Sequence, residues 1–283
     1  MVYGALLWVV VSAPPHAYAE ETAAERGAHL AALGGCAACH ASDDGAPVAG
    51  GYPLETPFGV FYGSNLTPSP EGIGSWTFED FERAMRHGRR PDGKSYYPAF
   101  PFTSFTLLTT PDLKDLWAWL QAQPPSANVP PPHDLKPLAR GRWKLGLWRS
   151  AGFTPGPWTD NPDASDAWNR GGYLAEGILH CGECHTPRGS LGAMKTRRAY
   201  GGSTLPPEPG PNITPHPTDG TGSWSADDWD TLLTLAMLPD GDVVSGEMAR
   251  VVEEGTDALS ADDLDALIIW LRALQPVASR GRP

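Results

Sequence analysis

Two copies of one five-residue pattern constrain this chain more than any other feature. The sequence reads CAACH over residues 36–40 and CGECH over residues 181–185, and these segments contain all four cysteines of the chain. Three chemistries use such cysteine pairs: a disulfide redox pair, a zinc site and the attachment of c-type haem. A redox pair needs no following His, and a structural zinc site needs four ligands gathered in one place. The His that directly follows each pair therefore favours haem.

The spacing suits haem for a geometric reason. In a helix, cysteines at positions i and i+3 lie on one face and reach two vinyl groups at one porphyrin edge, while the next residue turns its imidazole toward the iron. The pattern occurs twice with no cysteine left over, which predicts two covalently bound haem c groups. The predicted attachment residues and proximal iron ligands are Cys36, Cys39, His40, Cys181, Cys184 and His185.

The segments around the two motifs also align with each other. Corresponding residues are offset by 145 at Cys36 and Cys181 and by 151 at Trp119 and Trp270, so the intervening loops keep nearly the same length. An internal repeat of this kind indicates one domain used twice. The matching segments are RGAHL (26–30) and RGGYL (170–174), NLTP (65–68) and NITP (212–215), GIGSW (72–76) and GTGSW (220–224), and PDG (91–93 and 239–241).

Each repeat predicts the same order of elements: a helix, the cysteine motif, a long Gly/Pro-rich loop, a short helix after Ser-Trp, another loop and a terminal helix. No strand-like alternation of any length is evident, and Thr110 and Ser260 are candidate N-caps of the terminal helices. The predicted fold is all-α. It consists of tandem duplicated domains over residues 20–123 and 168–283, joined by a Pro-rich connector over 124–167.

The N-terminal residues 1–19 are typical of a secretory signal peptide. The apolar run GALLWVVV (4–11) precedes a small-x-small pattern, AYA (17–19), which predicts cleavage after Ala19. No Lys or Arg precedes the apolar run, so a short buried helix is the alternative. Later runs fall short of the roughly 20 apolar residues of a membrane span. We therefore expect an exported, periplasmic protein that is soluble or attached to a membrane through a partner.

Charge separates the connector from the rest of the chain. The formal net charge is −12, which disfavours nucleic acid as a partner. Residues 133–150, in contrast, hold five basic residues against one acid, Asp134, together with Trp143 and Trp148. This composition predicts either a strap that packs its Trp and Leu residues across the junction of the domains, or a surface that docks a partner or a membrane.

The chain resembles a known family, the diheme c-type cytochromes built from two class I cytochrome c lobes. It is most similar to the cytochrome subunits of periplasmic alcohol, gluconate and aldehyde dehydrogenases. The resemblance covers nearly the whole mature chain and implies electron transfer, with a dehydrogenase as donor and another cytochrome or a terminal oxidase as acceptor. The segments that carry it are GGYP (50–53), PFG (57–59), NLTP (65–68), YPAFP (97–101), WNRG (168–171) and CHTPR (184–188).

The resemblance also implies a Met as the second axial ligand of each iron. Met248 lies 63 residues after His185, where the family places this thioether, and a core-filling Met is the alternative. The matching position, 60 residues after His40, is Phe100 in YPAFP, where relatives have YPAMP. The remaining candidates at the first iron are Met85, His87, Lys94, a tyrosine, water or an open position.

Two tryptophans are candidate haem contacts. Trp76 and Trp224 each follow Gly-x-Gly-Ser at the start of the short helix. A buried indole N–H needs an acceptor, and either a haem propionate or a backbone carbonyl group can provide one.

These observations leave two functions. The first is an electron carrier without catalytic residues, in which the protein sets the potentials of two irons by axial ligation and burial. The alternative is a haem enzyme that uses an open first iron for peroxide, thiosulfate or nitrogen-oxide chemistry. Phe100 favours the alternative, and the lack of an obvious distal acid or base beyond His87 counts against it.

Overall fold

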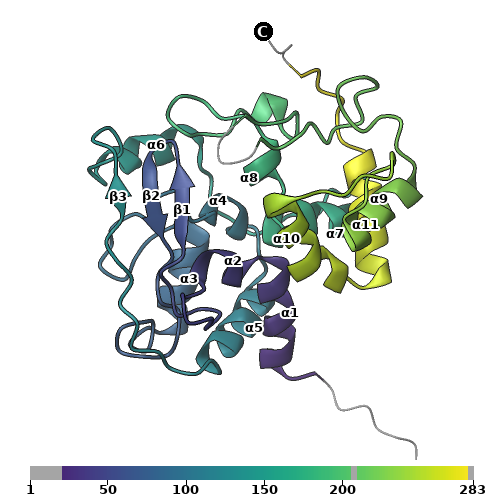
Figure 1. The fold of residues 1–283 in the computed structure, drawn as a ribbon. Helices are drawn as coiled ribbons and strands as arrows, with labels where there is room; N and C mark the ends of the chain where they lie inside the picture. The colour runs from purple at the N-terminus through teal and green to yellow at the C-terminus, as the bar shows by residue number, and fades with distance from the viewer. Residues whose placement is uncertain (1–20, 205–208, 280–283) are drawn as a thin grey trace, which may run out of the picture.

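The chain folds into a mostly helical protein with three short strands in the part that is described (Figure 1). The computed structural model describes residues 21–204 and 209–279, so the predicted signal peptide at 1–19 lies outside the described residues. Within those ranges, no helix is both long and apolar enough to cross a bilayer. The first elements are α1 (Ala23–Leu33), α2 (Cys36–His40), β1 (Pro53–Thr56), β2 (Gly59–Tyr62), α3 (Phe78–His87), α4 (Phe102–Phe105), α5 (Thr110–Gln121), β3 (Asp134–Leu135) and α6 (Lys144–Gly152).

The second half carries the remaining elements. They are α7 (Asp166–Tyr173), the π-helical turn η1 (Leu174–Ile178), α8 (Gly182–His185), the 3₁₀ turn η2 (Thr196–Arg198), α9 (Ala226–Leu235), α10 (Gly246–Glu254), the 3₁₀ turn η3 (Thr256–Ala258) and α11 (Ala261–Arg272). Figure 1 shows α1–α5 with the hairpin on one side and α7–α11 on the other, with α1 beside α10. One buried apolar cluster extends through both sides and includes Leu33, Leu108, Leu174 and Leu267.

Helices α1 and α5 cross at Gly27. A Cβ atom at this position would lie 2.0 Å from the carbonyl oxygen of Asp115, so only glycine lets the two backbones approach this closely. Helix α1 begins with a capping box in which Thr22 and Glu25 each accept the other's backbone N–H. Arg26 adds two hydrogen bonds, of 2.7 and 2.8 Å, to the carboxylate of Asp115.

The same crossing recurs between α7 and α11. A Cβ atom on Gly171 would lie 2.0 Å from the carbonyl oxygen of Ala266. Arg170, like Arg26, binds a carboxylate on the facing helix, here Asp263, through two bonds of 2.7 Å. The glycines, the arginines and the backbone positions that the glycines meet, Asp115 and Ala266, are paired by the sequence alignment, so the helix crossing is the same in both repeats. The acid differs in position, because Asp263 aligns with Asp112 and not with Asp115.

Gly27→Ala is expected to destabilise the protein by at least about 1–3 kcal/mol, the usual cost of overpacking, because the new methyl group meets backbone that cannot move aside. Gly146→Ala on α6 is the matched control, since a Cβ there meets nothing within 4 Å. The midpoint of urea unfolding of the holoprotein, followed by circular dichroism, measures both. An unchanged midpoint for Gly27→Ala would show that the α1–α5 crossing is not as tight as described.

The helix starts agree with the sequence with one correction. Capping boxes of Thr77 with Asp80 and Ser225 with Asp228 begin α3 and α9, just after the two tryptophans. Ser260 caps α11 as expected. The N-cap of α5 is Thr109 and not Thr110, because Thr109 is the extended residue whose hydroxyl accepts the N–H of Asp112.

A three-stranded antiparallel sheet departs from the all-α prediction. Its order is β1-β2-β3, with Leu54 opposite Phe61 and Gly59 opposite Leu135. Gly59 has φ +120°, and a Cβ there would lie 2.3 Å from the carbonyl oxygen of Asp134. The loop between the first motif and NLTP thus forms a hairpin, and the connector adds the third strand.

The connector contacts both sides of the molecule. The backbone N–H of Trp158 donates to the carbonyl oxygen of Leu107 at 2.8 Å, and its ring packs on Gly172. Leu145 and Trp148 of α6 face the interior cavity, whereas the side chain of Trp143 is 74% exposed. One part of the connector therefore packs across the junction and another part presents itself to solvent.

Candidate haem-binding site

The first cysteine motif forms the short helix α2. Residue 63 passes directly behind it, because a Cβ atom on Gly63 would lie 1.8 Å from the carbonyl oxygen of Cys39. This close approach places the carbonyl oxygen of Ser64 2.7 Å from Nδ1 of His40. The turn after the hairpin therefore fixes the orientation of the imidazole that follows the two cysteines.

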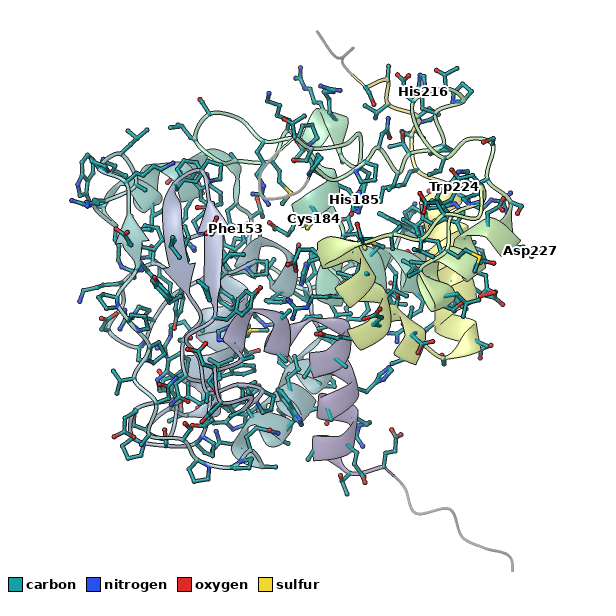
Figure 2. All side chains as sticks on the ribbon, viewed as in Figure 1. Phe153, Cys184, His185, His216, Trp224 and Asp227 are labelled. Atoms are coloured by element: carbon teal, nitrogen blue, oxygen red, sulfur yellow. The ribbon has the colours of Figure 1, made fainter. Side chains whose placement is uncertain are left out.

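The second motif has the same surroundings. Cys181 precedes α8, and a Cβ atom on Gly210 would lie 2.1 Å from the carbonyl oxygen of Cys184. The carbonyl oxygen of Pro211 lies 2.8 Å from Nδ1 of His185. Figure 2 shows Cys184 and His185 between Phe153, on the hairpin side, and Trp224, on the α9 side.

Both imidazoles are prepared to bind a metal through Nε2. A carbonyl oxygen can only accept, so Nδ1 of His40 and of His185 carries the proton and Nε2 keeps a free lone pair. Burial lowers the pKa of His40 and of His185, which keeps the rings neutral at neutral pH. A neutral, oriented imidazole is the form that an iron ligand requires.

The cysteines do not have the environment of a redox pair. Burial raises the pKa of Cys36 to about 12, of Cys39 to about 11 and of Cys181 to about 12, and it raises that of Cys184 as well. Redox-active CxxC pairs need a lowered thiol pKa, because the thiolate is the nucleophile. Among the described residues, no three His, Cys, Asp or Glu side chains are grouped to hold a metal ion, as a zinc site would require.

Both motifs open into one continuous cavity. Its volume is about 2490 Å³, whereas a pocket for one drug-sized ligand measures about 300–1,000 Å³. Most of its wall is apolar or aromatic, as a porphyrin macrocycle needs. Residues that line it next to the motifs include Leu66, Ile73, Phe81, Leu116, Leu120, Ile213, Leu232, Leu233, Leu267 and Leu271.

Two buried indole N–H groups that lack a hydrogen-bond acceptor indicate that haem fits this cavity. The Nε1 atoms of Trp148 and Trp229 are buried and have no hydrogen-bond partner, and both side chains line the cavity. A buried donor without an acceptor costs about 1–3 kcal/mol. Haem would bring carboxylates, so the apolar wall, the unpaired donors and the oriented imidazoles fit this group.

The candidates for the second axial ligand differ in whether they line the cavity. Met248 on α10 and Phe100 both line the cavity, as does Met85 of α3, which is 7% exposed. His87 is exposed at the end of α3 and does not line the cavity, and the ammonium group of Lys94 pairs with Asp92 at 3.1 Å. The structure thus brings Met248 and Phe100 to the same cavity as His185 and His40, and leaves His87 and Lys94 outside it.

Sequence reasoning did not anticipate His133. This connector residue lines the cavity between Phe61 and Tyr97, with ring centroids 5.2 and 6.0 Å away. Its Nδ1 accepts the backbone N–H of Tyr62 at 3.2 Å, so Nε2 carries the proton of the neutral ring and is a donor. A single His in a Pro-rich segment gives no local signal, because its neighbours come from the hairpin and the YPAFP loop.

Trp76 and Trp224 both line the cavity and are partly buried, as a contact with haem requires. The ring of Trp224 also packs against Trp229 with a centroid separation of 5.0 Å. Trp229 was not singled out by its sequence pattern, because it lies in an ordinary helical position of α9.

Comparison with known proteins decides the family. No protein-family model matches the chain. The diheme cytochrome c-type protein of Cereibacter sphaeroides is 39% identical over 282 residues, which cover 96% of this chain and 93% of that relative. This chain belongs to the diheme c-type cytochromes. Membership of the family implies covalently bound haem c and a role in electron transfer.

Two further relatives are parts of dehydrogenases. The fructose dehydrogenase cytochrome subunit of Gluconobacter japonicus is 37% identical over 95% of this chain. The cytochrome c subunit of the quinone alcohol dehydrogenase of Gluconacetobacter polyoxogenes is 38% identical over 92% of it. The chain spans 56% and 57% of the length of these two relatives, so it matches a little over half of each.

Proposed function

We propose that this chain is a periplasmic electron carrier with two haem c groups, one in each of two duplicated class I cytochrome c lobes at residues 20–123 and 168–283. It takes electrons from a dehydrogenase and passes them toward a respiratory or photosynthetic acceptor. The dehydrogenase partner is supported by the names of the relatives, and export by the sequence of residues 1–19. The connector at 124–167 joins the lobes.

The observation that carries this proposal is the pair of equivalent cysteine motifs, each with a neutral, oriented imidazole, on one apolar cavity. When bound, haem supplies one-electron exchange at its iron. The residues of this chain do the rest: Cys36, Cys39, Cys181 and Cys184 form the thioether attachments, and His40 and His185 are the proximal ligands. Met248, Trp76 and Trp224 complete the proposed contacts.

The two motifs also lie near each other, which suits transfer between them. Burial has the largest effect on the pKa of Cys39, and the Glu247 carboxylate, the Arg250 guanidinium group and the Cys184 thiol also act on it electrostatically. The guanidinium group of Arg250 also lies 5.7 Å from the ring centroid of Tyr52, on the first half of the chain. The helix that carries Met248 therefore contacts the surroundings of the first motif.

Two covalently bound haems per chain are expected. The pyridine haemochrome of denatured protein should give two c-type haems, and removal of one cysteine pair (Cys181→Ala with Cys184→Ala) should leave one. The matched variant, Cys36→Ala with Cys39→Ala, should also leave one, which counts the two sites separately. One haem in the native chain, or haem extracted by acidified acetone, would contradict the proposal.

A second candidate function rests on Phe100. Its side chain lines the cavity that also contains His40 and has no donor atom, so a first iron without a substitute ligand would have one open side. Such an iron could carry out peroxide, thiosulfate or nitrogen-oxide chemistry. Turnover of any of these at a rate that depends on the first haem, with slow electron exchange, would favour the enzyme over the carrier.

A further inference from the structure

An unusual concentration of unpaired positive charge lies on and around α6. We define the basic face as Arg89, Arg140, Arg142, Lys144 and Arg149 together with the exposed indole of Trp143. Among the described residues, none of these five cations forms an ion pair with a carboxylate. They therefore remain uncompensated on a chain whose formal net charge is −12.

Backbone oxygens and aromatic rings hold most of these cations in place. Arg142 donates to the carbonyl oxygen of Ser95 at 2.6 Å, Lys144 to that of Leu138 at 3.1 Å, and Arg140 to that of Leu135 at 2.8 Å. Arg149 lies over the ring of Phe153 with its guanidinium carbon 4.8 Å from the centroid. Fixed cations that form no ion pair with a carboxylate repel one another, so a negative partner would stabilise this arrangement.

The basic face lies over the wall of the cavity on the side of the first motif. The guanidinium carbon of Arg142 is 4.4 Å from the ring centroid of Tyr97, and Tyr97 lines the cavity that contains His40. Trp148, from the same helix as Lys144, also lines this cavity. Arg142 and Lys144 themselves line the cavity, so a partner on this face would lie next to the space that contains His40.

The surface is also concave where the charges gather. A pocket of about 250 Å³ lies there, lined by Arg89, Lys94, Ser95, Arg142, Trp143 and Gly146. Trp143 lines it and has a side chain that is 74% exposed, whereas Leu145 and Trp148 line the large cavity. Leu145 and Trp148 of α6 therefore add no apolar area to this surface for insertion into a membrane interface.

We propose that the basic face docks a redox protein with an acidic surface, which exchanges electrons through the first haem. The inference rests on the proposed carrier function and adds where a partner binds and what its surface chemistry is. Complementary charge would steer encounter, so the rate of exchange should fall with ionic strength. The indole of Trp143 provides an aromatic contact of the kind enriched at protein interfaces.

The test measures access of an anionic oxidant to the first haem. Holoprotein is reduced with dithionite and oxidised by ferricyanide in a stopped-flow instrument at low salt, with and without poly-L-glutamate as a model of an acidic surface. We expect ferricyanide to oxidise the first haem quickly and poly-L-glutamate to protect it. The variant Arg140→Glu with Lys144→Glu should lose this protection and slow ferricyanide oxidation about tenfold, the lower range of electrostatic steering.

A matched control makes the same change of net charge on another part of the surface. Lys195→Glu with Arg197→Glu makes an equal change at two exposed cations near the second motif, and it should keep both the fast oxidation and the protection. If both double variants behave alike, or if poly-L-glutamate protects neither haem of the native protein, the docking proposal is wrong.

Native protein that sediments with vesicles of phosphatidylcholine and phosphatidylglycerol, without protection by poly-L-glutamate, would assign the face to a membrane instead. Protein that lacks covalent haem would contradict the carrier function itself, so the two failures are distinguishable.

Discussion

Met248→Ala is expected to lower the reduction potential of one haem and leave the other unchanged. A thioether ligand favours the ferrous form, so its loss stabilises ferric iron. We expect a fall on the order of 100 mV, within the roughly 0.8 V over which axial ligands set haem potentials. The weak sulfur-to-iron charge-transfer band of the ferric protein in the near infrared should disappear with it. Redox titration and near-infrared absorption of the purified protein measure the two effects.

Met237→Ala is the matched control for this substitution. Met237 is 38% exposed and does not line the cavity, although it also follows His185 in the chain. The Met237→Ala substitution should leave the near-infrared sulfur-to-iron band and both reduction potentials unchanged. If the band persists in Met248→Ala, the sulfur ligand is another methionine and the place assigned to α10 in the site is wrong.

The parts of the site that depend on local spacing could be predicted from the sequence. The motif helix α2 and the N-terminal ends of α3 and α9 follow from i, i+3 geometry and from capping residues, which act within a few positions. In the sequence, Gly27 and Gly171 stand out only as identical residues at equivalent positions of the repeat. The structure supplies their physical reason, since each is the point at which two helix backbones touch.

The parts that depend on tertiary contacts could not be predicted in this way. Each strand of the β1–β2 hairpin has four residues, too few for an alternating pattern to stand out. The π-helical turn η1 follows directly from α7, and it places Ile178 against Gly34 of the other half. His133 and Trp229 reach the cavity only because distant segments fold around them. Their positions at the cavity therefore cannot be predicted from the sequence.

Native protein is expected to contain one haem that binds carbon monoxide or cyanide readily, and Phe100→Met is expected to abolish that binding. Phe100 packs against Tyr96 and Phe105, with ring centroids 5.3 and 5.7 Å away, and offers no donor atom. An apolar ring beside the iron also gives a bound water no polar partner.

In Phe100→Met the first haem should become low-spin, with a second near-infrared sulfur band and a potential raised on the order of 100 mV, again within the roughly 0.8 V range of axial ligation. Phe100→Leu is the matched control: it shortens the side chain without adding a donor and should keep the ligand-binding haem. Electron paramagnetic resonance and magnetic circular dichroism report the spin state and the ligand set.

Native protein that is wholly low-spin with two sulfur bands would make Met85 the ligand, since it lines the same cavity. A second nitrogen ligand would instead point to His133, whose Nδ1 would then have to give up the N–H of Tyr62 or rotate away from it. Either result would remove the open iron on which the enzyme alternative depends and leave electron transfer as the role of both haems.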